Sequence, residues 1–219
     1  MSNPNTRLAL YLLHGVGENP TVWQDIVSEL AISRPLRAPW LPGLKPTDQR
    51  CFTFADAAGA LASEIELQGS GQADVTGHAL GAMVALQLAL DCPKFIHRLI
   101  LIDGQAKPPA GQLRSSRLVL RLMPRSRLEA QGITKPRLME VLDAMADFDV
   151  RERLGEINAP TLVLVGADNR GDLEGAEQLA QGIPDARLHL IPGGGPQLTA
   201  THPKELARLI REFVKETDG

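Results

Sequence analysis

The sequence predicts an α/β fold, built as a mostly parallel sheet of about six strands with helices on both faces. Short apolar runs rich in β-forming residues alternate with longer segments of helical periodicity along the whole chain. Most of these runs are continuously apolar, as strands are when both faces of their sheet are covered. Alternation of this kind requires right-handed crossovers, and these place the strands parallel in one sheet.

The expected strands are residues 8–13, 33–38 (a weak signal), 73–76, 98–102, 161–165 and 187–191. Helical periodicity covers residues 22–30, 54–68, 79–90, 173–181 and 204–216. Two of these helices have clear start signals. Thr53 precedes the second helix as an N-cap residue, and Pro203 stands ahead of the last one.

Residues 106–158 interrupt the alternation. They contain two or three helical segments and no credible strand, between the loop at Lys107-Pro108-Pro109 and the loop at Asn158-Ala159-Pro160. An insertion after a strand accounts for this segment more economically than a second domain. We therefore expect a single domain over residues 1–219, with a short helical cap at about 106–158.

Composition excludes several classes of protein. The chain has 219 residues, of which 43% are hydrophobic and 22% charged, with a net charge of −3. These values fit one globular domain, and the apolar runs are too short to span a membrane. The near-neutral charge argues against a nucleic-acid partner. The first apolar run is too short for the core of a signal peptide. Cys51 and Cys92 are expected to be free thiols. We therefore expect a cytoplasmic protein. No metal-ligand spacing or cofactor motif is found.

Two motifs stand beyond the carboxyl ends of expected strands, where such sheets bind ligands. They are Leu-Leu-His-Gly-Val-Gly at 12–17 and Val-Thr-Gly-His-Ala-Leu-Gly at 75–81. Gly77 and Gly81 bracket a sharp strand–helix turn, where small residues let the helix pack on the sheet. This turn resembles the nucleophile elbow of the α/β-hydrolase family, Gly-x-Ser-x-Gly. With Leu-Pro-Gly at 41–43 and the run at 160–166, the resemblance covers nearly the whole chain.

The resemblance also implies a Ser-Asp-His triad, and this chain departs from it at each position. Ala79 stands where the family has its nucleophilic serine, Asn169 where it has the acid, and Pro196 where it has the histidine. A side chain without a heteroatom cannot attack an acyl carbonyl. We therefore expect a protein with a degenerate triad that lacks hydrolase activity and keeps a small-molecule or partner-binding role.

Two enzymatic alternatives remain open. The first is an active, esterase-like serine hydrolase whose nucleophile at position 79 was replaced by alanine. Its acid would be Asp168, next to the family's acid position, or Asp103, at the alternative acid position, and its base would be His202. The second is a proton-transfer enzyme of the same fold that uses His14 or His78.

The backbone N–H groups of Val16 and Leu80 match the family's oxyanion-hole donors, and they need no particular side chain. We expect them to form a pocket together with His14 and His78, although local structural roles are the commoner fate of both histidines. A small ligand bearing a carbonyl or a carboxylate would fit two such donors. The alternative is a pocket that has collapsed.

The cap carries clustered arginine. Residues 106–128 contain Lys107 and five arginines but no acid, and Arg114, Arg117, Arg121 and Arg125 are spaced for one helix face. Leu118, Leu122 and Met123 would form an opposing apolar stripe. Such a surface would cover an anionic ligand or dock an acidic protein partner. The favoured alternative is pairing with the acids that follow, Glu140, Asp143, Asp147, Asp149, Glu152 and Glu156.

Overall fold

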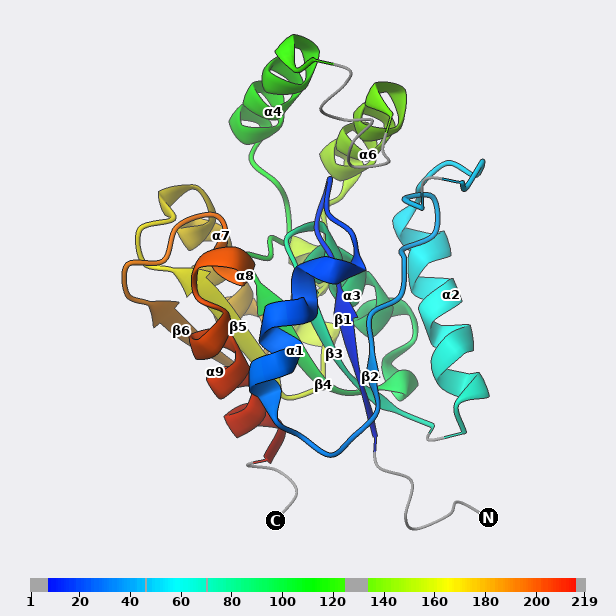
Figure 1. The fold of residues 1–219 in the computed structure, drawn as a ribbon, viewed down its shortest axis with the longest axis vertical. Helices are drawn as coiled ribbons and strands as arrows, with labels where there is room; N and C mark the ends of the chain where they lie inside the picture. The colour runs from blue at the N-terminus through cyan, green and yellow to red at the C-terminus, as the bar shows by residue number, and fades with distance from the viewer. Residues whose placement is uncertain (1–7, 46, 70, 125–133, 216–219) are drawn as a thin grey trace.

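A six-stranded parallel sheet forms the centre of the computed structural model, which describes residues 8–45, 47–69, 71–124 and 134–215 (Figure 1). The strand order is β2-β1-β3-β4-β5-β6, and every neighbouring pair is parallel. The strands are β1 (Ala9–Leu13), β2 (Leu36–Arg37), β3 (Ala73–His78), β4 (Ile96–Ile102), β5 (Thr161–Gly166) and β6 (Ala186–Ile191). The predicted α/β class and all six strands are confirmed, although the weakly signalled β2 is only two residues long.

Helices cover both faces of this sheet (Figure 1). One face carries α1 (Gln24–Leu30) and α9 (Pro203–Lys215), and the other carries α2 (Phe54–Leu67), α3 (Leu80–Asp91) and α7 (Arg170–Gly182). Four further helical segments among the described residues are short: helix α8 (Leu198–Thr201) and the 3-10 turns η1 (Pro20–Trp23), η2 (Pro93–Phe95) and η3 (Arg151–Glu156). None of the helices within the described ranges is long and apolar enough to cross a membrane.

The continuous apolar runs are explained by burial on both sides of the sheet. Along β1, Leu10 and Leu12 pack toward α1 and α9, whereas Tyr11 and Leu13 pack toward α2 and α3. Successive side chains of a strand point to opposite faces, so a strand covered twice needs an apolar residue at every position. This packing fixes where each strand ends and therefore where the loops of the site begin.

The cap consists of α4 (Ala110–Leu122) and α6 (Lys135–Asp147), which stand together beyond the carboxyl edge of the sheet (Figure 1). Four buried leucines join the two helices in a small core of their own: Leu113, Leu120, Leu138 and Leu142. Arg137 attaches α6 to the loop after β2, because its guanidinium donates hydrogen bonds to the backbone carbonyls of Asp48 and Arg50.

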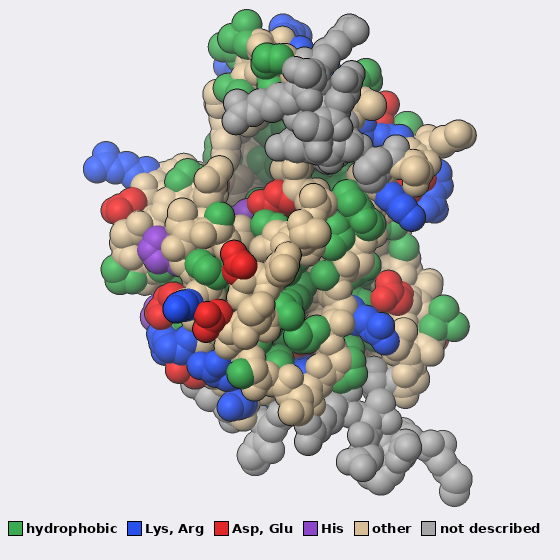
Figure 2. Space-filling view, in the orientation of Figure 1, with side chains coloured by type: hydrophobic (Ala, Val, Ile, Leu, Met, Phe, Trp, Pro, Cys, Tyr) green, Lys and Arg blue, Asp and Glu red, His purple; other side chains and the backbone are tan. Residues whose placement is uncertain are grey.

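The apolar stripe predicted for α4 was wrong. Leu118 and Leu122 are 58% and 77% exposed, and only Met123 of the three is turned inward, beside the cap core. The helix instead buries Leu113 and Leu120, because the packing partner α6 lies on that side. Hydrophobic and basic side chains therefore share the outside of the cap (Figure 2).

The predicted pairing of the cap arginines with later acids is found in part. Arg117 pairs with Asp143 of α6 at 2.6 Å, and Lys107 pairs with Asp149 at 3.0 Å. Arg114 and Arg121 lie exposed on the outer side of α4. Arg125 and Arg127, which the sequence placed in the same cluster, lie outside the described residues.

Candidate functional site

The turn from β3 into α3 has the backbone geometry of a nucleophile elbow. Ala79 lies at φ 49° and ψ −110°, a conformation that residues with a Cβ rarely adopt. A Cβ on Gly77 would collide with the backbone of Gly81, and one on Gly81 would collide with the carbonyl of Leu13. The two glycines thus let α3 approach β1 and β3 closely. The sharp turn exists here without the serine that it usually presents.

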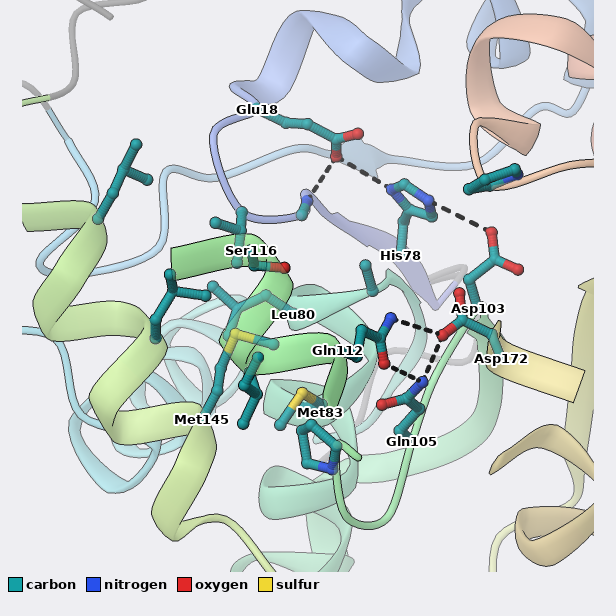
Figure 3. A pocket seen from close by; sticks show the side chains of 18 of the residues that line it. Glu18, His78, Leu80, Met83, Asp103, Gln105, Gln112, Ser116, Met145 and Asp172 are labelled. Carbon is teal, nitrogen blue, oxygen red and sulfur yellow. Dashed lines mark hydrogen bonds and ion pairs between the residues drawn. The ribbon is translucent and has the colours of Figure 1, made fainter. Parts of the chain in front are cut away.

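A cavity of about 410 Å³ opens in front of this turn, between the sheet edge and the cap (Figure 3). Its volume lies in the range of small-molecule pockets. The cap side and the start of α3 supply an aliphatic wall that includes Leu80, Met83, Leu113, Leu138, Leu142 and Met145. The opposite end is polar and carries Glu18, His78, Asp103, Gln105, Gln112 and Asp172. The cavity is therefore amphipathic, and the residues described as lining it include no lysine or arginine.

His78 lies between two carboxylates at the polar end (Figure 3). Its Nδ1 donates a hydrogen bond to Glu18 Oε2 at 3.0 Å, and its Nε2 faces Asp103 Oδ2 at 3.6 Å. Burial opposes a charge on the imidazole, but the two carboxylates outweigh it and raise the pKa of His78 to about 9. His78 is therefore an imidazolium ion at neutral pH, and the residue is only 5% exposed.

Glu18 is held in place from two sides. Besides His78, its Oε2 accepts a hydrogen bond from the backbone N–H of Gly15 at 2.6 Å. Burial opposes ionisation of this carboxyl, yet the contacts with His78 and Gly15 lower its pKa below the ordinary value. Glu18 is thus the anionic partner that fixes the orientation of the His78 ring.

Asp103 belongs to a second group of polar side chains. Its Oδ1 accepts a hydrogen bond from Asn169 Nδ2 at 3.2 Å, and the same amide donates to Asp172 Oδ2 at 2.8 Å. Gln105 and Gln112 donate their side-chain N–H groups to the other oxygen of Asp172 (Figure 3). Burial, followed by the charge of Asp103, raises the pKa of Asp172 against these hydrogen bonds.

The three positions at which the sequence departs from the triad motif lie in different surroundings. Ala79 and Pro196 both line the cavity, so a methyl group and a proline ring stand at the expected places of the nucleophile and the base. Asn169 is buried behind the cavity wall, where it bonds to Asp103 and Asp172. Of the two alternative acids that the sequence suggested, Asp103 lines the cavity, whereas Asp168 is exposed and is not among the lining residues.

The chain's five histidines, all within the described ranges, contribute one ring to the cavity, that of His78. His14, expected in the pocket, is fully buried against Trp40, and its Nδ1 bonds to the carbonyl of Gly15 while its Nε2 accepts from the N–H of Leu41. Burial lowers the pKa of His14, so the ring is neutral. His202, the fallback base, bonds to Thr201.

The two backbone amides expected as oxyanion donors both belong to cavity-lining residues. Leu80 is the first residue of α3, so its N–H has no acceptor within the helix. Val16 follows β1 and faces the same cavity. Among the described residues, no group of three or more histidine, cysteine or acidic side chains is arranged to hold a metal ion.

Sequence reasoning missed four polar residues of the site, namely Glu18, Gln105, Gln112 and Asp172. Two of them carried a local signal. Glu18 stands three residues after Gly15, a spacing that suits a side chain bonding back to a loop N–H, and Asp172 lies in the first turn of α7. The two glutamines had no such local signal. Gln105 lies in the loop after β4 and Gln112 at the start of α4, and both meet Asp172 only in the folded chain.

Comparisons with known proteins agree with this architecture. Residues 10–209 match the family described as the alpha/beta hydrolase family. A putative carbamate hydrolase, RutD of Variovorax paradoxus, is 29% identical over 195 residues, which cover 74% of this chain and 73% of that protein. A pimeloyl-[acyl-carrier protein] methyl ester esterase of Aromatoleum aromaticum is 29% identical over 248 aligned positions, which cover 94% of this chain and 98% of that protein.

Solved structures share the fold at lower identity. MenH from S. aureus superposes with a TM-score of 0.83 at 19% identity, over 100% of this chain and 97% of its own. A hydrolase from Pseudomonas aeruginosa PA01 superposes with a TM-score of 0.82 at 20% identity, over 97% of this chain and 91% of its own. With its elbow turn, its strand order and a family match over most of its length, the chain belongs to the alpha/beta hydrolase family.

Proposed function

We propose that this chain is a ligand-binding member of its family that does not hydrolyse esters through a serine nucleophile. The observation that carries the proposal is Ala79 at the tip of the elbow, where the reaction needs a hydroxyl group. A methyl group can neither attack a carbonyl carbon nor form an acyl-enzyme. Its relatives include esterases and hydrolases, which supports a pocket derived from that of a hydrolase. We propose none of their substrates for this chain.

The surroundings of Ala79 support the same conclusion. A general base must reach the nucleophile, but Pro196 occupies the cavity wall at the expected position of the base. His78 is already charged between Glu18 and Asp103, so it has no free lone pair with which to accept a proton. Asn169 cannot orient a histidine as an anion does.

The retained features of the site favour binding. The cavity is open, its wall is mostly aliphatic, and its polar end presents fixed donors and acceptors. Val16 and Leu80 both line this cavity, and their backbone N–H groups are the donors that would bind a ligand oxygen under this proposal. A pocket of this size with a few convergent polar groups is the usual form of a small-molecule site.

Incubation of the purified protein with p-nitrophenyl esters of several chain lengths, and with a serine-directed fluorophosphonate, tests the loss of hydrolysis. We expect no turnover above that of the heat-denatured protein and no covalent label. Ester turnover that saturates with substrate, or labelling of the folded protein, would contradict the proposal.

One observation favours a second candidate, a serine hydrolase that has lost its nucleophile by replacement. Ala79 keeps the strained elbow backbone that an exposed nucleophile requires. The variant Ala79→Ser separates the two candidates, with Ala60→Ser on the exposed side of α2 as the control. We expect Ala79→Ser to stay within about tenfold of the wild-type rate, because a triad serine without its base contributes little. A gain of several orders of magnitude would establish the second candidate.

A further inference from the structure

We propose that the cavity selects a ligand with an aliphatic tail and a neutral head group that both accepts and donates a hydrogen bond. Primary amides and alcohols have this chemistry. The inference rests on the proposed binding function and adds the class of ligand. It is carried by two buried polar atoms that face each other at the polar end of the cavity.

These atoms are His78 Nε2 and Asp103 Oδ2. They form an ion pair at 3.6 Å, a separation too long for a hydrogen bond, and neither atom has a hydrogen-bond partner among the described residues. Both residues are 5% exposed, and both line the cavity. A buried polar atom without a partner is costly, so a ligand that supplies the missing bonds gains affinity from both.

The structure holds both atoms in fixed positions. On the far side of the imidazole, Glu18 accepts a hydrogen bond from Nδ1 (Figure 3). On the far side of the carboxylate, Asn169 donates a hydrogen bond to Oδ1. Asp103 also has a positive φ of 49°, directly after the last residue of β4. Aspartate tolerates this conformation better than most residues. The pair therefore needs little reorganisation when a ligand binds.

The chemistry of the pair defines the head group. The imidazole of His78 presents an N–H donor at Nε2, and Asp103 presents an acceptor at Oδ2. An alcohol or a primary amide can accept from the first and donate to the second. An ester has no donor, so it leaves Asp103 without a partner.

Charged head groups meet repulsion at one side of the same pair. A carboxylate would place its negative charge beside Asp103, near Glu18 and Asp172 as well. An alkylammonium would bind Asp103 but face the N–H of a cationic His78. The carboxylate that the sequence also suggested is therefore the less suitable ligand.

The remainder of the cavity defines the tail. Its described lining includes no phenylalanine, tyrosine or tryptophan, and the wall opposite the polar end is leucine and methionine. Methionine side chains adapt to irregular apolar shapes, and aliphatic walls offer no ring for stacking. A flexible alkyl chain suits this surface better than an aromatic ring.

Five probes with the same eight-carbon chain test the inference: octanamide, 1-octanol, methyl octanoate, octanoate and octylamine. Their dissociation constants are measured by isothermal titration calorimetry at pH 7. We expect octanamide and 1-octanol to bind at least about tenfold more tightly than the other three, as two recovered hydrogen bonds imply. The ratio between octanamide and 1-octanol then shows which of the two head groups fits better.

The variant Asp103→Asn supplies the matched test, with Asp185→Asn in the exposed turn before β6 as the control. We expect the preference for octanamide over methyl octanoate to fall to about threefold or less in Asp103→Asn and to persist in the control. If Asp103→Asn fails to fold, the ¹⁵N shift of His78 Nε2 in the wild type serves instead. It should move on addition of octanamide and stay in place with methyl octanoate.

The outcomes separate the two proposals. Equal binding of all five probes, or tightest binding of octanoate or octylamine, would overturn the head-group inference and leave a ligand-binding protein. Enzymatic release of methanol from methyl octanoate would overturn the proposed function. Failure of every probe to bind would overturn both.

Discussion

Asn169 and Asp103 lie side by side beyond the ends of β5 and β4, and Asn169 Nδ2 donates a hydrogen bond to Asp103 Oδ1 at 3.2 Å. The same amide nitrogen bonds to Asp172 at 2.8 Å. One neutral donor thus connects two buried acids. A carboxylate in place of the Asn169 amide would face these two acids without a donor between them.

The variant Asn169→Asp tests this relationship. We expect it to lower the free energy of unfolding by about 3 kcal/mol at pH 7.5, because it replaces two hydrogen bonds with repulsion between buried carboxylates. Urea unfolding followed by circular dichroism measures the loss. Asn158→Asp in an exposed loop is the control and should change the value by less than about 0.5 kcal/mol. Equal effects of the two substitutions would contradict this account of the network.

The fold followed from local patterns that the sequence shows directly. Continuous apolar runs located the strands, and the glycines at 77 and 81 located the elbow, because both features depend on neighbouring residues alone. The buried face of α4, in contrast, does not follow from a local pattern. Leu118 and Leu113 are equally apolar, and which of them is buried depends on where α6 packs. Periodicity within one helix cannot supply that direction.

The polar network of the site was less accessible to sequence reasoning for a related reason. Glu18 and Asp103 follow β1 and β4, and His78 is the last residue of β3, so the three meet only when these strands lie side by side. Sequence motifs identified the strand ends but not the pairing of their side chains. The departures from the triad motif at positions 79, 169 and 196 can be read from the sequence, whereas the contacts among Glu18, His78 and Asp103 cannot.

The charge of His78 predicts how stability depends on pH. Its pKa is raised to about 9 in the folded chain, so the stability that it contributes is complete below its ordinary value of 6.5 and is lost as the pH rises through 9. We expect the free energy of unfolding to fall by on the order of 3 kcal/mol between pH 6.5 and pH 9.5. Urea titrations at several pH values measure this slope.

Two variants show whether that slope belongs to His78. In His78→Gln the fall over the same range should be largely abolished, because the titrating group is gone. In His189→Gln, which removes a half-buried imidazole from β6, the fall should remain as in the wild type. A direct reading comes from the ring ¹⁵N shifts of His78, and a midpoint below 7 would contradict the proposed charge state.

The strained backbone at Ala79 predicts that glycine stabilises this position. Glycine adopts φ 49° and ψ −110° freely, whereas alanine does so at a cost of about 1 to 3 kcal/mol. After allowance for the greater freedom of glycine in the unfolded chain, we expect Ala79→Gly to raise the free energy of unfolding by about 1 kcal/mol. Ala60→Gly on the exposed side of α2 should lower it by about the same amount.

Substitution of glycine by alanine is expected to change stability in opposite directions at Gly81 and Gly59. A Cβ on Gly81 would press into the carbonyl of Leu13, where backbone cannot yield, so Gly81→Ala should cost at least about 4 kcal/mol or prevent folding. A Cβ on Gly59, inside α2, meets nothing within 4 Å, so Gly59→Ala should add up to about 1 kcal/mol of stability. Thermal and urea unfolding of both variants measure the contrast. A well-folded Gly81→Ala protein of wild-type stability would show that α3 does not need its close approach to β1.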